Sequence, residues 1–438
     1  MKLNKKPETI FTHEGAKAVI INPKLQLRRS VMACMLWEDE FYEDGESIAD
    51  RIKKLIPLVN PEVVGGIAIE AREKMHLRHV PLLIVREMAR LSQNHHLVDE
   101  TLYKIIQRPD ELTEFLAIYW KDGKEKLSAQ VKNGLRMAFT KFNAFQLAKY
   151  NHVNSKIKLR DVIRLVHPKP PSDELSEVYR KLSRNEGLFA PDTWESALVG
   201  GADKKQTFER LISEGKLGGM AFLRNLRNMK ESGVSEEIIF EGFEKMKTDK
   251  ILPFRFISAA KYAPQWENKI EKAMLKCLEG KEKLPGKTAL VIDGSGSMFG
   301  TPISEKSEID RFEAAAALTI LAREICQDVC VIVFSNHAYL VPARHGFGLR
   351  DVLREKAEGQ GTNTQNGILK ASQEGYDRII IVTDEQSHQS ISNPLIDTKG
   401  YVVNVASYKN GIGYGRWVHI DGWSEAVLDY IRVSESDN

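Results

Sequence analysis

Five oxygen-bearing side chains in the last third of the sequence have the chemistry and the order of a divalent-metal site. Two carboxylates and three hydroxyls make up the set, namely Asp293, Ser295, Ser297, Thr362 and Asp384. Hard oxygen donors of this kind suit octahedral Mg²⁺ or Mn²⁺ and suit zinc poorly. The spacing Asp-x-Ser-x-Ser lets alternate side chains of one tight loop point to a common centre, and the intervening glycines permit the sharp turn. We therefore expect one bound divalent cation, Mg²⁺ in the first instance, with a coordination position left for an acidic ligand.

Each of these loops, taken alone, has a simpler explanation than a metal site that binds a ligand. Ser295 and Ser297 could cap a helix and Asp384 could simply end a strand, but three such loops in one domain favour a metal site. A metal with a purely structural role stays open. Catalysis by the two aspartates is disfavoured, because no histidine or third acid has the motif of a general base. Within the second loop, Thr362 is preferred to Thr364 because it directly follows the Gly-x-Gly turn.

The segments that carry these loops have the pattern of a parallel β-sheet flanked by helices. Short, β-branched and almost continuous apolar runs occupy residues 288–298, 329–335, 378–385, 401–407 and 417–423. Such runs are typical of strands that are buried on both faces. Helical segments alternate with them at residues 311–326, 349–358, 363–375 and 424–435. The alternation predicts a doubly wound α/β domain over residues 286–438, with the metal loops meeting at the carboxyl ends of its strands.

Residues 1–285 have a different pattern, in which apolar residues recur at helical spacing. Ten or more short amphipathic segments are present, and several start at Ser, Asp or Asn with acidic residues in the first turn, as helix N-termini do. Strand-like alternation is nearly absent. This region is therefore predicted to be all-α, with antiparallel helix pairs stacked as a HEAT-like α-solenoid. The change of pattern near Leu284 places the domain boundary between residues 285 and 286.

Charge is spread unevenly along the chain, although the net charge is only +3. Lys and Arg outnumber Asp and Glu in residues 1–285, whereas the remaining residues are net acidic, which favours a polyanionic partner for the helical region. No apolar leader and no run of about 18 apolar residues is present, so we expect neither secretion nor a membrane span, and a cytoplasmic location is the default. The four cysteines form no CxxC pair and are expected to be buried or free thiols.

Cations are densest between residues 120 and 170, where Tyr150, His152 and His167 add rings that can stack on bases. A mixture of this kind suits RNA backbones and unstacked bases. The candidate RNA-binding side chains are Lys132, Arg136, Lys141, Lys149, Arg160, Arg164, His167 and Lys169. An ordinary solvated helix face is the alternative, and His167 could also be a half-buried histidine with its own partners. Two more basic clusters, at residues 72–90 and 224–228, are candidates for the concave side of a solenoid.

The metal motif and several helical segments resemble known families. The pattern D-x-S-x-S…T…D resembles the metal-ion-dependent adhesion site of the von Willebrand factor A family, with Asp384 binding directly or through water. In residues 11–285, stretches such as FTHEGAKA, LRRSVMACMLWEDEFYEDG, KLRDVIRLVHPKP and LPFRFISAAKYAP resemble the TROVE module. With the two modules in this order, the whole chain resembles a prokaryotic member of the Ro autoantigen family.

This resemblance implies a ring of HEAT-like helical repeats that is closed by the metal-binding domain. It also implies that small noncoding RNAs of the Y type bind the basic outer surface and that single-stranded 3′ ends of misfolded RNAs enter the central hole. Lys149, Arg160 and His167 match the family's RNA-contacting segment, the last in an H-x-K-P turn. The spacing between Lys149 and His167 differs by one residue from that of animal relatives, which leaves Lys156 and Lys158 ambiguous.

Together these observations predict a monomeric, non-enzymatic RNA-binding scaffold that takes part in RNA quality control or processing. Its expected partners are a small Y-like noncoding RNA, single-stranded RNA ends and an exoribonuclease, with no membrane. The alternative is a protein-adhesion module, in which the metal recruits an acidic partner such as a ribonuclease. A metal-dependent hydrolase is a third hypothesis, which turnover of labelled RNA would support.

Overall fold

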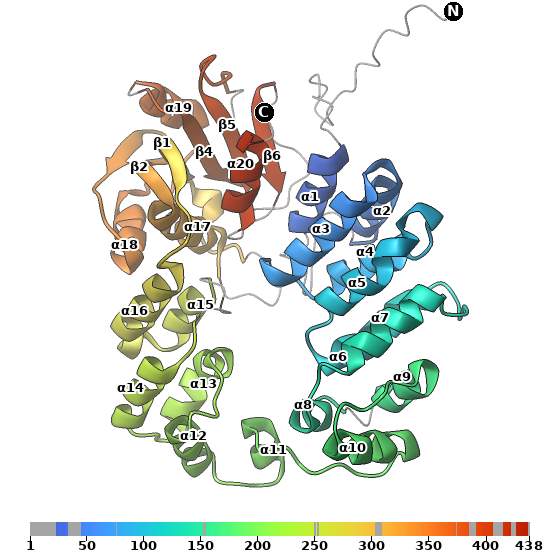
Figure 1. The fold of residues 1–438 in the computed structure, drawn as a ribbon. Coiled ribbons are helices and arrows are strands. Elements are labelled where there is room, and N and C mark those ends of the chain that lie inside the picture. Colours follow the sequence, from blue (N-terminus) through green and yellow to red (C-terminus); the bar gives the residue numbers. More distant parts are fainter. Residues whose placement is uncertain are drawn as a thin grey trace, which may run out of the picture. The chain divides into compact units, whose positions relative to one another are not determined.

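The structure, a computed structural model of the 438-residue chain, describes residues 23–33, 45–75, 77–151, 155–248, 251, 254–302, 309–373, 375–384, 391–405, 415–421 and 426–436. The chain forms two compact units (Figure 1). Among the described residues, the first unit comprises those in the ranges 23–33 and 46–201, and the second comprises those in the range 202–436. The stretch FTHEGAKA and the residues Cys34, His76 and His152 lie outside the described part of the chain.

The first unit is built from short helices. They are α1 (Pro23–Ala33), α2 (Gly45–Leu55), η2 (Ile56–Leu58), α3 (Pro61–Glu73), α4 (His79–Met88), η3 (Ser92–Asn94), α5 (His95–Ile105), α6 (Pro109–Tyr119), α7 (Ala129–Phe139), α8 (Ala144–Lys149), α9 (Leu159–Val166), α10 (Asp173–Arg184) and α11 (Trp194–Val199). Capping explains several starts: the hydroxyls of Ser128 and Ser172 accept the backbone N–H groups of Val131 and Leu175. Each cap satisfies a donor that the first helical turn leaves free.

These helices are stacked in the manner of an α-solenoid. Each of α3, α5 and α7 contacts the next but one helix, and α4 contacts α6 in the same way. The approach of α7 to α5 depends on Gly134, where an added Cβ would lie 2.9 Å from the carbonyl oxygen of Asp99. Phe115 and Phe139 are fully buried between the layers. Contacts between neighbours and next neighbours are what stacked helix pairs require, so the helical-repeat prediction is confirmed.

The second unit starts with five more helices of the same kind. They are α12 (Lys204–Ser213), α13 (Gly219–Glu231), α14 (Glu236–Lys245), α15 (Phe254–Tyr262) and α16 (Glu267–Leu278), with η4 (Pro264–Trp266) before the last. Helix α12 contacts α14, α13 contacts α15 and α14 contacts α16, which repeats the pattern of the first unit. The rings of Phe222 and Phe243 meet edge to face with centroids 5.0 Å apart, a geometry that aromatic pairs prefer.

A six-stranded sheet follows in the same unit, with the order β3-β2-β1-β4-β5-β6. Its strands are β1 (Leu284–Asp293), β2 (Cys326–Phe334), β3 (Ala338–Val341), β4 (Arg378–Thr383), β5 (Lys399–Asn404) and β6 (Trp417–Asp421). All neighbours are parallel except β2 and β3. The doubly wound α/β prediction is confirmed. The short edge strand β3 was not predicted, because Tyr339 and Leu340 are exposed and four residues show no clear period.

Helices cover the sheet and bring its polar loops to one edge. They are α17 (Arg311–Ile325), α18 (Gly346–Lys356), α19 (Thr364–Ser372) and α20 (Ala426–Ser436), with the short η5 (Gly296–Met298) after β1. Val291, Phe334 and Ile381 belong to one buried cluster, to which Ile368 of α19 contributes. The register pairs Asp293 with Phe334, and Ile292 with Val382. The central strands therefore end level with one another, where the predicted metal ligands lie.

The helices α15 and α16 contact α17 inside this compact unit, and α16 also contacts α18. The predicted boundary between residues 285 and 286 falls just inside β1, whereas compactness groups residues 202–438 together. That boundary therefore stays a prediction from the sequence. A search of the helices in the described ranges finds none with the length and apolarity needed to cross a membrane.

Candidate metal centre and nucleic-acid interface

The carboxylate of Asp293 is the buried anchor of the candidate metal centre. It ends β1, has no exposed surface, and accepts hydrogen bonds from the backbone N–H of Ser295 at 2.9 Å and from the hydroxyl of Thr383 at 2.5 Å. Burial raises the pKa of Asp293 to about 6, and the charge of Asp384 acts in the same direction, while the bonds from Ser295 and Thr383 lower it. The charge of Asp384 therefore acts on the Asp293 carboxylate across the loops.

The two serines of the first loop come together beside this anchor. Their hydroxyl oxygens lie 3.3 Å apart, with Ser295 buried and Ser297 partly exposed. Gly294 lets the loop pack closely against Ala357, because an added Cβ would lie 2.7 Å from the Cβ of that residue. The carbonyl oxygen of Gly294 also accepts the hydroxyl of Ser335, which ties the loop to the end of β2.

The second loop, which carries Thr362, is bonded to the first. The backbone N–H of Gly296 donates to the carbonyl of Gln360 at 2.8 Å. Asn363 then caps α19 by accepting the N–H of Asn366. Thr364 is fully buried, and its hydroxyl has no hydrogen-bond partner among the described residues, whereas Thr362 keeps a little exposed surface. These observations do not decide between the two hydroxyls, so the preference for Thr362 as a ligand stays a prediction.

The third loop brings in a cation that the sequence reasoning missed. Asp384 is fully buried, and its Oδ2 accepts a hydrogen bond from a terminal nitrogen of Arg311 at 3.0 Å. The same nitrogen lies 3.4 Å from the carbonyl oxygen of Ser297. One signal could have found it: Arg311 is the first residue of α17, where a positive charge opposes the helix dipole.

The donor set of these loops fits a hard divalent cation. The residues that hold it would be Asp293, Ser295, Ser297, Thr362 and Asp384. Within the described ranges no three His, Cys, Asp or Glu side chains form a group that could hold a metal ion. Two carboxylates would therefore need hydroxyl oxygens to complete the coordination, and this arrangement supplies them. Magnesium accepts such ligands and keeps waters at its other positions.

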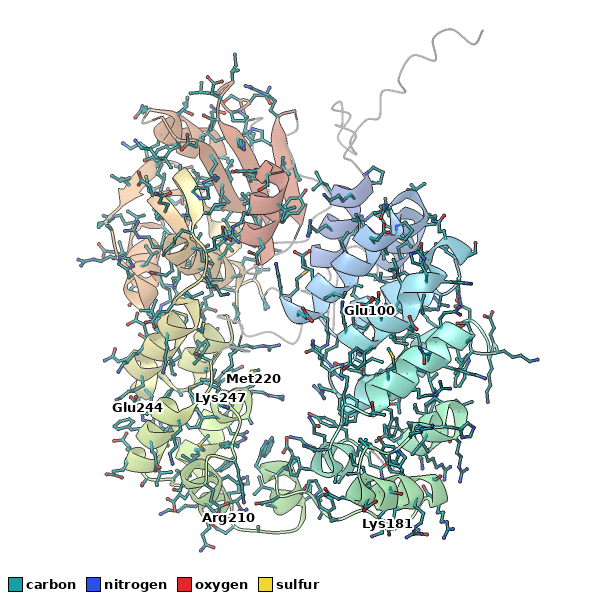
Figure 2. The ribbon with its side chains drawn as sticks, viewed as in Figure 1. Glu100, Lys181, Arg210, Met220, Glu244 and Lys247 are labelled. Carbon is teal, nitrogen blue, oxygen red and sulfur yellow. The ribbon has the colours of Figure 1, made fainter. Side chains whose placement is uncertain are left out.

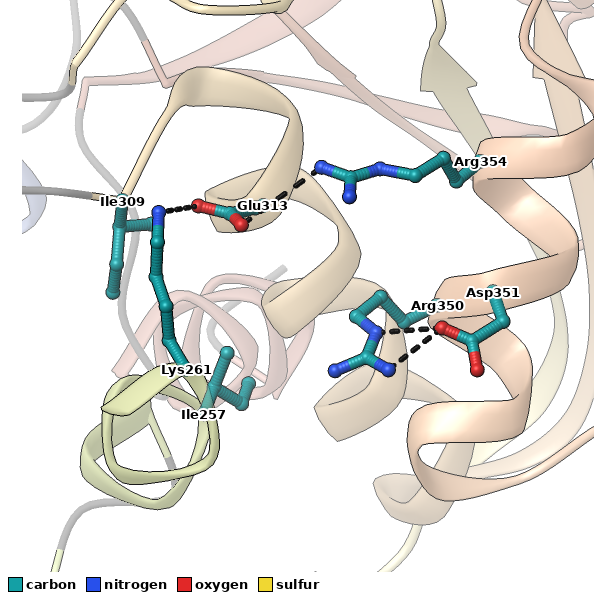
Figure 3. Close-up of a pocket in the computed structure, with 7 residues that line it drawn as sticks. All are labelled: Ile257, Lys261, Ile309, Glu313, Arg350, Asp351 and Arg354. Atoms are coloured by element: carbon teal, nitrogen blue, oxygen red, sulfur yellow. Dashed lines mark hydrogen bonds and ion pairs between the residues drawn. The ribbon is translucent and has the colours of Figure 1, made fainter. Parts of the chain in front are cut away.

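A small pocket where α15, α17 and α18 meet is lined by paired charges (Figure 3). Glu313 of α17 binds the ammonium of Lys261 at 2.9 Å and lies 3.8 Å from Arg354. Arg350 of α18 binds both Asp351 at 2.7 Å and Glu267 of α16 at 3.0 Å. These pairs join the last helical repeats to the sheet domain, so we interpret the pocket as a structural contact.

Three of the predicted RNA-binding cations serve as links between helices. Arg136 of α7 donates to the carbonyl of Val166 at the end of α9 at 2.9 Å, and Arg164 donates to the carbonyl of Ser183 at 3.1 Å. The ammonium of Lys141 binds the carbonyls of Tyr103 and Ile106, and burial lowers its pKa. Cations in these positions satisfy carbonyls that a helix C-terminus leaves free.

The remaining candidates are less committed to the fold. Lys132 and Lys169 form no ion pair with any described side chain, and Arg160 lies 3.6 Å from Asp161. The ammonium of Lys149 lies 5.7 Å from the centroid of the Tyr150 ring. These cations can therefore turn to a phosphate at little cost to the fold.

Elsewhere on the helices, surface cations are often neutralised by an acid one turn away. Examples are Lys104 with Glu100 at 2.7 Å, Lys181 with Glu177 at 3.7 Å and Arg210 with Glu214 at 3.1 Å (Figure 2 labels Glu100, Lys181 and Arg210). Pairs of this kind are what an ordinary solvated helix face contains. Lys132 and Lys169 differ from them in having no such partner among the described residues.

His167 has an unusual backbone. It closes α9 with φ 47° and ψ 60°, the left-handed conformation, and its side chain is exposed. Asn185 is the one other non-glycine residue with positive φ in the described chain. Histidine tolerates this region better than most residues, yet glycine is the usual choice. The alternative of a half-buried histidine is wrong, and the strained turn carries an exposed ring beside α7.

In the basic cluster at residues 72–90, the surface prediction is wrong for Arg72 and Arg86, which are buried, while the side chain of Arg78 stays partly exposed. Each is engaged within the helical stack: Arg72 with Glu111 at 2.7 Å, Arg78 with Asp110 at 2.9 Å, and Arg86 with Glu87 at 2.7 Å. In the cluster at 224–228, Arg227 pairs with Glu231 at 2.8 Å and Asn225 is buried. Acidic side chains from α6 and neighbouring turns form ion pairs with these cations.

Comparison with known proteins gives a consistent result. A family model described as the TROVE domain matches residues 26–186 and 184–314. Telomerase protein component 1 of Rattus norvegicus is 23% identical over 301 residues, which cover 49% of this chain and 11% of that protein. The Mus musculus protein of the same name is 37% identical over 78 residues, 16% of this chain and 3% of that protein. The chain thus spans about a tenth or less of the length of these relatives.

The fold has a close counterpart among solved structures. The crystal structure of the Deinococcus radiodurans RO (RSR) protein superposes with a TM-score of 0.67, covering 94% of this chain and 100% of that one at 15% identity. Identity at that level shows a shared fold. Because the TROVE model matches well over half of the residues, the protein belongs to the Ro/TROVE family.

Proposed function

We propose that this protein is a non-catalytic scaffold that holds small Y-type noncoding RNAs and the single-stranded 3′ ends of misfolded RNAs for quality control or processing. Membership of the Ro/TROVE family supports an RNA-binding, Ro-like function. The observation that carries the proposal is the exposed, left-handed His167 turn. Backbone strain of this kind tends to persist where function requires it.

Uncommitted charge lies next to that turn. Arg136 binds the carbonyl of Val166, the residue before His167, so the outward face of α7 runs beside the histidine. Lys132 is one turn earlier on the same face, and Lys169 is two residues beyond His167. Phosphates are attracted by the ammonium groups, and an unpaired base can stack on the imidazole ring.

The test is a titration of the full chain with a labelled small structured RNA that has a single-stranded 3′ tail. The logarithm of the binding constant should fall linearly with the logarithm of salt concentration, because each phosphate contact releases counterions. Lys132→Ala and Lys169→Ala should each reduce that slope by about 0.7–0.9. Affinity that does not vary with salt would contradict the proposal.

The matched control is Lys104→Ala. It removes the same charge from the same unit, but from a side chain that already pairs with Glu100. Its slope and affinity should equal those of the parent protein. If Lys104→Ala weakens binding as much as Lys132→Ala, general charge rather than a defined surface explains the affinity.

We further propose that Asp293, Ser295, Ser297, Thr362 and Asp384 hold one Mg²⁺. The cation would supply an electrophilic position for an acidic ligand, because the two protein carboxylates carry no more negative charge than is needed to balance the charge of Mg²⁺. The support is the buried pair of aspartates within linked loops. Calorimetry with Mg²⁺ should detect one site that Asp384→Ala removes.

A second candidate function, adhesion to an acidic protein partner such as an exoribonuclease, is favoured by the same loops. Arg311 adds positive charge beside Asp384, which leaves a loaded site with a surplus that suits a carboxylate ligand. EDTA should then abolish partner binding and leave RNA binding intact. Loss of RNA binding on chelation would instead make the metal part of the RNA site.

The remaining parts of the proposal concern state and activity. We propose a monomer in the cytoplasm that performs no chemistry on RNA. Incubation of the pure protein with labelled RNA and Mg²⁺ should give no cleavage. Turnover that Asp293→Ala abolishes would establish the hydrolase hypothesis in its place.

A further inference from the structure

Arg311 has a position that the fold alone makes costly. Its side chain is 4% exposed, and it occupies the first position of α17. The N-terminus of a helix carries partial positive charge, so a guanidinium there is repelled by the helix dipole. Burial adds the cost of desolvating the charge. A group placed at such cost needs a strong electrostatic partner.

The candidate metal loops provide that partner. The guanidinium lies 3.0 Å from Oδ2 of Asp384, which is fully buried, and 3.4 Å from the carbonyl oxygen of Ser297. Both acceptors belong to the predicted ligand loops. Arg311 thus occupies the electrostatic role that a metal cation would also fill.

Resting on the metal site proposed above, we propose that Arg311 is a resident counter-charge that stabilises the metal-free loops and lowers their affinity for the divalent cation. Without metal, the guanidinium offsets one of the two buried carboxylates. With metal, the cation and the guanidinium of Arg311 would both lie beside the Asp384 carboxylate. Repulsion between these two positive charges opposes metal entry.

A different role predicts the opposite result. If Arg311 only braced the Asp384 carboxylate in its ligating position, its removal would weaken metal binding. Removing a competing charge strengthens metal binding. The direction of the change in affinity therefore separates the counter-charge from the brace.

The experiment measures Mn²⁺ binding to the full chain by electron paramagnetic resonance, which counts the free ion. Arg311→Gln removes the charge but keeps donors for Asp384 and the Ser297 carbonyl, and it should bind Mn²⁺ at least about tenfold more tightly, since charges a few ångströms apart in a buried site interact strongly. Arg311→Lys keeps the charge and should bind like the parent. The metal-free Arg311→Gln protein should also melt at a lower temperature than the parent.

Arg323→Gln is the matched control. Arg323 lies in the last turn of the same helix and binds the carbonyl of Val329, away from the metal loops. It should leave the Mn²⁺ affinity unchanged. Arg311→Gln binding that is equal to or weaker than the parent's would overturn the counter-charge, while the metal site would stand. Absence of Mn²⁺ binding in the parent and in all variants would overturn the metal site and this inference together.

Discussion

At the residue scale, the proposed metal ligand Asp293 has a raised pKa. Its folded pKa of about 6 lies above the ordinary value of 3.8. A raised carboxyl pKa means that the folded, metal-free protein holds the proton more tightly than the unfolded chain does. Below pH 4 the free energy of unfolding includes no cost for ionising Asp293. It falls as the pH rises to about 6, by roughly 3 kcal/mol in total.

The first prediction is that Mg²⁺ stabilises the protein in a pH-dependent way. Metal needs the ionised carboxylate, so the rise in melting temperature on adding Mg²⁺ should be full at pH 7.5 and should shrink below pH 6. Thermal unfolding with and without Mg²⁺ measures it. Asp293→Asn should remove the rise at every pH, whereas Asp351→Asn, on exposed α18 surface, should keep it. A rise that is constant from pH 5 to 7.5 would argue against Asp293 as a ligand.

The second prediction concerns the left-handed backbone of His167. His167→Gly should stabilise the fold or leave it unchanged, by up to about 1 kcal/mol, because glycine adopts this conformation without steric cost. The same change should weaken binding of structured RNA, because the ring is lost. Chemical denaturation and RNA titration measure the two effects.

Asn185→Gly is the control for that test. Asn185 closes α10 with φ 60°, so it shares the backbone conformation without belonging to the predicted RNA surface. It should gain similar stability and keep RNA affinity. Equal RNA affinity in the parent and in His167→Gly would remove the imidazole from the interface.

At the element scale, Lys141 shows how a basic side chain can join helices. Its ammonium binds the carbonyls of Tyr103 and Ile106 at the end of α5, and lies 4.4 Å from the centroid of the Tyr103 ring. The third prediction is that Lys141→Met costs about 1–3 kcal/mol of unfolding free energy, because these acceptors lose their partner. RNA affinity should stay unchanged.

Lys132→Met on α7 provides the contrast. Since Lys132 forms no ion pair with the described side chains, its loss should change stability by less than about 0.5 kcal/mol while lowering RNA affinity. Urea denaturation and RNA titration of both variants test this exchange of effects. A pair in which Lys141→Met lowers RNA affinity and spares stability would reverse our assignment of these two lysines.

The elements that could be predicted from sequence are those in which local signals agree. Helix α10 has Ser172 as its N-cap, acids in its first turn and Asn185 as its C-cap, and each of these features has a local physical cause. Strand β4 is buried along its whole length, which its unbroken apolar run indicates. Edge strand β3 has neither signal.

Contacts between residues that are far apart along the chain could not be predicted from the sequence. Arg72 pairs with Glu111 across 39 positions, and Arg311 pairs with Asp384 across 73. Charge composition cannot distinguish such arginines from exposed ones, because the partner is supplied by tertiary packing. The motif of the metal loops is visible in the sequence, and metal binding by these loops stays a prediction. Arg311 has a local signal at the start of α17, but its pairing with Asp384 has none.

At the scale of the whole molecule, the proposed sites for Mg²⁺ and for RNA lie in different compact units. The metal loops lie within residues 202–438, and the candidate RNA surface on α7 and α9 lies within residues 46–201. The units have separate packed interiors, so each ligand should act on its own unit. Coupling would require a two-state element that both ligands bias.

The last prediction is that Mg²⁺ and RNA protect different parts of the chain from hydrogen exchange. Mg²⁺ should slow exchange in η5, in the loop before α19 and at the end of β4, because a ligand lowers the population of locally open states. A small structured RNA should slow exchange around α7 and the His167 turn. Asp384→Ala should lose the first protection and retain the second, and His167→Gly should do the reverse. If Mg²⁺ changed RNA affinity by more than about tenfold, a coupling free energy above roughly 1.4 kcal/mol would link the two sites. Binding of the two ligands would then not be independent.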